Sequence, residues 1–136
     1  MNISDLYAQQ RQVDDFENCD FYHTIDLSHR ETVWGHVDLR GRERDYLGGC
    51  DLDGKSVLEV GPATGHLAFY MEQQGATVTC LELPDTDVGD LVPRTDLANW
   101  DQLISDRRRH LDRIVNGFWY CHRKLGSKTN VIYGTV

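Results

Sequence analysis

Two acidic residues and two glycines stand at spacings that suit the binding of a nucleoside-type ligand. An apolar run over Ser56 to Val60 contains Glu59 and leads into Gly61, and Gly65 follows in the same turn. Gly61 allows a sharp turn and leaves room for a ligand, because it carries no Cβ. Glu82 closes the next apolar run, where a carboxylate can accept two hydrogen bonds from a ribose diol.

The residues between the glycines argue against a phosphate ligand. Pro62 has no N–H group, whereas a pyrophosphate site depends on several backbone N–H donors and a helix N-terminus. The chain has neither the GxGxxG spacing of dinucleotide sites nor a GxxxxGK[ST] phosphate loop. S-adenosylmethionine carries no phosphate, so we expect it as the cofactor. The expected cofactor-binding residues are Glu59, Gly61, Pro62, Ala63, Gly65, Glu82 and Leu83.

Simpler interpretations stay open for these residues. A turn from strand through glycine to helix is common without any ligand, and Glu82 could be an exposed charge at a strand end. His66, at the expected helix start, could contact a ligand, but a solvated or capping role is favoured.

The elements that position these residues alternate between strand and helix. We expect a core strand over 57–60, a helix over 66–74 ended by Gly75, a strand over 77–83, a loop over 84–93, a helix over 99–125 kinked or split at Asn116–Gly117, and a third strand over 130–133. This alternation predicts an α/β fold, a Rossmann-like parallel sheet with strand order third-second-first and helices on both faces.

The part of the chain before this core is expected to be a separate segment. We predict two units, a helical or lid segment over 1–50 and a partial, S-adenosylmethionine-binding Rossmann-like domain over 51–136. Within the first unit, residues 1–18 are expected to be helical, residues 21–27 extended, and residues 42–47 a short helix.

The residues Glu59-Val60-Gly61-Pro62-Ala63-Thr64-Gly65 resemble motif I of the class I S-adenosylmethionine-dependent methyltransferases, [DE]xGxGxG. In that resemblance Glu82 matches the ribose-binding acidic residue, and Ala63 replaces the middle glycine. The segments over 21–27 and 37–41 are also similar to a region before motif I in a subgroup that includes tRNA wobble-uridine modification proteins. The resemblance implies an enzyme that transfers a methyl group, with the N-terminal segment folded over the cofactor.

The resemblance covers only the cofactor-binding half of such a domain. Members of the family carry further strands and substrate residues after the third strand, whereas this chain ends at Val136. We therefore expect a sheet truncated after its third strand, whose open edge is covered by a second chain or by a missing C-terminal half. No catalytic residue can be assigned.

Composition and net charge limit the expected acceptor, metal content and location of the protein. The net charge of −8 favours a small-molecule acceptor over nucleic acid, although a tRNA acceptor stays open. Arg107-Arg108-Arg109 is the one basic cluster and is expected on the solvated side of a helix, with a substrate or partner contact as the alternative. The four cysteines form no CxxC pair, so no metal site is expected. Without a signal peptide or an apolar run long enough for a membrane span, we expect a cytoplasmic protein with no membrane contact.

Two alternatives belong to other functional classes. One is a non-catalytic S-adenosylmethionine-binding fragment or partner-dependent subunit, which the early end of the chain suggests. The other is a nicotinamide-dependent oxidoreductase, which the glycine spacing disfavours.

Overall fold

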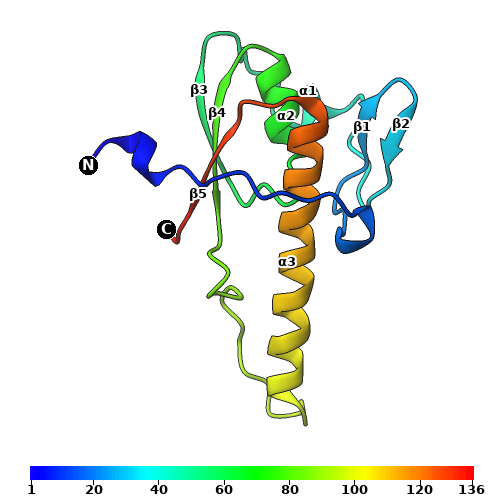
Figure 1. Cartoon of the computed structure of the whole chain (residues 1–136), viewed down its shortest axis with the longest axis vertical. Helices are drawn as coiled ribbons and strands as arrows, with labels where there is room; N and C mark the ends of the chain where they lie inside the picture. The colour runs from blue at the N-terminus through cyan, green and yellow to red at the C-terminus, as the bar shows by residue number, and fades with distance from the viewer.

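A three-stranded parallel sheet and the helices that connect its strands form the centre of the chain. The computed structural model describes residues 1–136 and is shown in Figure 1. Its elements in chain order are η1 (Ile3–Leu6), η2 (Phe16–Asn18), β1 (Ile25–Ser28), β2 (Glu31–Val33), α1 (Glu43–Tyr46), β3 (Ser56–Val60), α2 (His66–Gln73), β4 (Thr77–Glu82), α3 (Trp100–Leu125) and β5 (Asn130–Tyr133).

The sheet confirms the predicted strand order. β3 pairs in parallel with β4, and β4 pairs in parallel with β5, so β4 is central. Gly75 and Gly126, both with positive φ angles (95° and 61°), follow the ends of α2 and α3 as predicted. The structure is therefore α/β, with the strands and helices predicted after residue 55 in place.

The prediction that helices cover both faces of the sheet is wrong. α2 and α3 lie on the same side of the sheet (Figure 1). Two right-handed crossovers that step in the same direction must place both helices on one face. On the other face Leu58 is 61% exposed and Val60 is 59% exposed, so β3 is not the doubly covered strand that its apolar sequence suggested.

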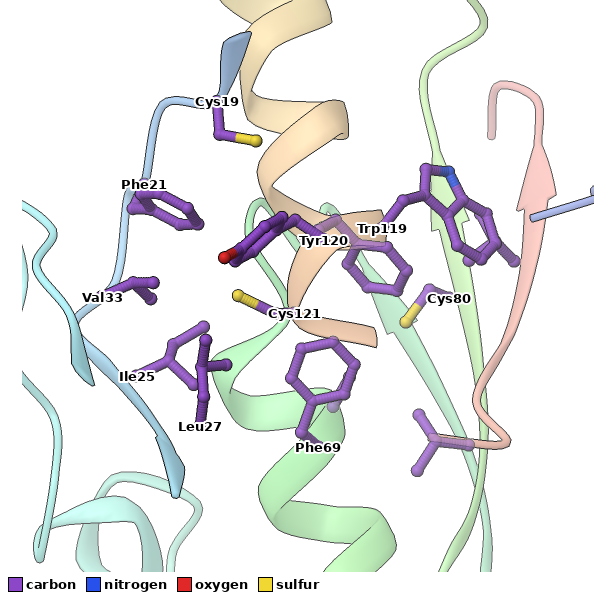
Figure 2. Packing of buried hydrophobic residues seen from close by; sticks show 14 of the residues in the cluster. Cys19, Phe21, Ile25, Leu27, Val33, Phe69, Cys80, Trp119, Tyr120 and Cys121 are labelled. Atoms are coloured by element: carbon purple, nitrogen blue, oxygen red, sulfur yellow. The ribbon is translucent and has the colours of Figure 1, made fainter. Parts of the chain in front are cut away.

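The core joins the first 50 residues to the rest of the chain. Figure 2 shows side chains of the N-terminal part, such as Phe21, Ile25 and Val33, facing Phe69 of α2 and Cys121 of α3. On the other side of α3, Trp119 lies toward β4 and β5 (Figure 2). The two helices thus lie between the parallel sheet and the antiparallel β1–β2 hairpin.

The predicted helix over residues 1–18 is wrong. Only the short 3₁₀ turns η1 and η2 form there. Leu6 and Phe16, which the helical pattern places on one apolar face, are about half exposed, while Val13 is buried. The backbone instead bonds to other elements: Ala8 N–H donates to the Val131 carbonyl (2.8 Å), and Asp20 N–H donates to the Arg113 carbonyl (3.0 Å). We call residues 8–24 the N-terminal strap.

The predicted kink in the last helix is also absent, because α3 runs unbroken from Trp100 to Leu125. Gly117 instead permits a close contact between two backbone segments. A Cβ at this position would lie 2.5 Å from the carbonyl oxygen of Asp20, so the glycine allows the N-terminal strap to cross α3 in backbone contact.

None of the helices is both long and apolar enough to span a lipid bilayer.

Candidate functional site

In the loop between β3 and α2, every second residue from 61 to 65 has a left-handed backbone conformation. Gly61 has φ +72°, Ala63 has φ +50°, and Gly65 has φ +89°. A Cβ at Gly65 would lie 2.7 Å from the Phe69 ring, so packing requires this glycine. A Cβ at Gly61 would meet no atom within 4 Å, so that backbone faces open space in which a ligand can approach.

Ala63 is the only residue other than glycine with a positive φ angle in the chain. The left-handed conformation costs an L-residue about 1–2 kcal/mol. This is the position where the resemblance expects a glycine. The loop therefore keeps the backbone shape that the glycine would give, at the cost of local strain.

Glu82 lies at the end of β4 beside this loop. Its Oε1 accepts a hydrogen bond from the backbone N–H of Leu83 (2.8 Å). Burial raises the pKa of Glu82, and the backbone N–H groups of Leu83 and Ala63 oppose that rise. The Glu82 carboxylate thus lies close to the backbone of Ala63.

Glu59 is the second carboxyl group at the site. It lies on the helix-covered face of β3, directly paired in register with Cys80 of β4. Its Oε2 is buried and has no hydrogen-bond partner. Burial, and then the charge of Glu82, raise the pKa of Glu59 to about 7. No cationic side chain is among the groups that shift the pKa of either glutamate.

A cavity of about 570 Å³ opens where β4 and β5 end. Its floor includes Glu82, Leu83 and Tyr133, and α3 forms the opposite wall. Small-molecule sites commonly have volumes of about 300–1,000 Å³. The full lining is Arg11, Glu82, Leu83, Pro84, Asp85, Ser105, Arg108, Arg109, Leu111, Asp112, Ile114, Val115 and Tyr133.

The structure brings together most of the residues that the sequence singled out. Glu82 and Leu83 line the large cavity. Pro62 and Ala63 line a small neighbouring void together with Glu82 and Tyr133. The other three predicted residues line neither cavity. Glu59 is largely buried on β3, and Gly61 and Gly65 stand at the two ends of the loop.

The N-terminal strap supplies contacts that sequence reasoning missed. The backbone N–H of His23 donates to Thr64 Oγ1 in the glycine loop (3.1 Å), and Thr64 is completely buried. The favoured solvated or capping role of His66 is wrong, because His66 is buried and its Nε2 lies 3.1 Å from Glu43 Oε1. The only sequence signal for these contacts was the aromatic and β-branched segment that contains His23.

No protein-family model, no curated protein and no solved structure matches this chain.

Proposed function

We propose that this chain binds S-adenosylmethionine at the glycine loop, within a Rossmann-like domain of the class I methyltransferase type. The observation that carries the proposal is the pair Glu59 and Glu82. Both carboxyl groups are largely buried beside a turn that is open to ligands, and neither has a cationic partner. A buried carboxyl group in this state favours a ligand that brings positive charge.

The charge of the site separates the candidate cofactors. S-adenosylmethionine brings an ammonium group and a sulfonium centre, and it has a ribose diol for Glu82. A dinucleotide would place phosphate oxygens near two carboxyl groups, in a loop where Pro62 offers no N–H donor. The site therefore supports the methyl donor over a nicotinamide cofactor.

Each residue has a specific part in this proposal. Glu82 accepts hydrogen bonds from the ribose diol, and the Gly61 backbone lets the ligand approach the end of β3. Glu59, with its unpartnered Oε2, faces the positive charge of the donor. The cofactor supplies an activated methyl group, and the chain contributes chiefly by holding donor and acceptor in line. No side chain at the site is assigned as a catalytic base.

A non-catalytic binding role or a partner-dependent role is the second candidate. It is favoured by the uncovered sheet face with Leu58 and Val60 and by the outer edge of β3, which pairs with no strand. A second chain on this surface is the arrangement we propose in that case.

Thermal unfolding with and without ligand tests the proposal. S-adenosylhomocysteine at millimolar concentration should raise the unfolding temperature, because it binds only the folded chain. NAD at the same concentration should leave the temperature unchanged. The matched controls are Glu82→Ala, which should lose the rise, and Asp90→Ala, an exposed carboxylate without a hydrogen-bond partner, which should keep it. A rise with NAD alone would contradict the proposal.

A further inference from the structure

The cavity at the ends of β4 and β5, which Glu82 lines, also carries basic side chains. Ser105, Arg108 and Asp112 follow one another at intervals of three and four residues on α3, so they lie on one stripe of the helix and line the same wall. Arg109 lies next to this stripe, and Arg11 reaches the wall from the N-terminal strap. Three arginines thus surround the opening opposite Glu82.

Two of the three arginines are already neutralised. Arg11 pairs with Asp112 (2.7 Å) and also donates to Asn116 Oδ1 (2.9 Å). Arg109 pairs with Asp106. The third, Arg108, makes no ion pair and no side-chain hydrogen bond, so the cavity wall presents one free guanidinium group.

The cationic wall and the acidic floor are separate parts of the cavity. None of the three arginines is among the groups that shift the pKa of Glu82. A volume of about 570 Å³ leaves room for a nucleoside at the floor and a second small group at the wall. Because a guanidinium group binds carboxylate or phosphate through two parallel hydrogen bonds, the group that fits this wall is an oxyanion.

We propose that Arg108, flanked by Arg11 and Arg109, binds the anionic group of the methyl acceptor, which is then a small molecule carrying a carboxylate or a phosphate. The inference rests on the proposed function, since it places the acceptor beside the donor in one cavity. An anionic acceptor also complements a cationic donor and explains how a chain of net charge −8 can attract it locally.

The first experiment measures anion binding by the full chain. Inorganic phosphate and malonate are titrated at constant ionic strength set with sodium chloride, and amide chemical shifts are followed by NMR. We expect saturable shifts that are largest in α3 around Arg108. The anion that binds more tightly identifies the chemistry of the acceptor group.

Two variants make this result specific. Arg108→Gln should weaken binding at least tenfold, and Arg108→Lys should recover part of the loss, because it keeps the charge but not the paired hydrogen bonds. Arg30→Gln, an exposed arginine that makes no ion pair, should leave binding unchanged. Equal losses in Arg108→Gln and Arg30→Gln, or shifts that do not saturate, would overturn the proposal.

A second titration separates the acceptor from the cofactor. S-adenosylhomocysteine should bind Arg108→Gln as tightly as it binds the unchanged chain, and phosphate or malonate should bind together with it. Competition between the anion and S-adenosylhomocysteine would assign Arg108 to the cofactor's own carboxylate and overturn the acceptor role. If S-adenosylhomocysteine does not bind while the anion still requires Arg108, the proposed function fails and the acceptor role fails with it, leaving an anion site alone.

Discussion

Ala63 is the residue at which the structure departs most clearly from the expected glycine loop. The sequence has an alanine at this position, where the resemblance has glycine. The structure shows that its backbone is left-handed, with φ +50°, and that Ala63 lies beside Glu82. Alanine in place of glycine therefore introduces backbone strain at this position.

Ala63→Gly should make the protein more stable. The variant removes about 1–2 kcal/mol of left-handed strain and adds about 0.5–1 kcal/mol of unfolded-state entropy, so a net gain of roughly 0.5–1 kcal/mol is expected. Urea unfolding measures it, with Ala8→Gly in the N-terminal strap as the comparison that should lose stability. A stability loss in Ala63→Gly would show that this backbone is not strained.

Glu59 should make stability depend on pH. Because its pKa is about 7 in the folded chain, against an ordinary value of 4.5, the folded state holds a proton that the unfolded chain releases. The free energy of unfolding should therefore fall as pH rises from 4.5 to 7, by on the order of 2 kcal/mol. Glu59→Gln should flatten this fall, while Glu17→Gln on the exposed η2 turn should not. Parallel pH profiles for all three proteins would contradict the assigned burial of Glu59.

At the scale of elements, the regular pattern of the core was predictable and the N-terminal strap was not. The strands β3, β4 and β5 and the helices α2 and α3 follow from apolar periodicity and from glycines at the helix ends. The strap takes its path from contacts with distant residues, such as Ala8 with Val131 and His23 with Thr64. Periodicity within a short segment carries no information on such partners.

Two effects of opposite sign decide how the substitution Gly117→Ala in α3 changes the stability of the protein. Replacing glycine by alanine inside a helix ordinarily stabilises it by about 0.5–1 kcal/mol. Here the new Cβ would lie 2.5 Å from the Asp20 carbonyl oxygen, so Gly117→Ala should instead destabilise the protein by about 1–3 kcal/mol. Chemical denaturation measures the difference. A more stable variant would mean that the strap does not cross α3 at this residue.

For the candidate site, the sequence predicted the residue types but not the state of their charges. The glycine loop and Glu82 could be found from spacing alone. The missing partner of Glu59 Oε2 and the free guanidinium of Arg108 could not, since both depend on which side chains from distant elements come close. The three arginines of the basic cluster are exposed on α3 as expected, and Arg108 and Arg109 also line the cavity.

At the scale of the whole molecule, all helical cover lies on one side of the sheet. This leaves Leu58 and Val60 exposed next to the outer edge of β3, which has no partner strand. Exposed apolar residues on an open edge promote association. The uncovered face is therefore the surface on which a partner would act, and it is distinct from the ligand cavity.

We expect the isolated chain to associate weakly as concentration rises, and Val60→Lys to reduce that association. Lysine on an edge strand opposes pairing through its charge and solvation. Val92→Lys, at a loop valine that is 82% exposed, is the matched control and should change little. Sedimentation velocity over a concentration series measures the association. Equal association of the two variants would show that the β3 face does not mediate it.

The central claim, that Glu59 and Glu82 receive a cationic cofactor, is tested most directly by calorimetric titration of S-adenosylmethionine at pH 7 in two buffers of different ionisation enthalpy. A bound cation should lower the pKa of Glu59 from about 7, so binding should release about half a proton. Glu59→Gln should bind without this release, and Glu82→Ala should lose about 1.5–3 kcal/mol of binding free energy. Binding with no proton release in the unchanged chain, or no binding at all, would contradict the account.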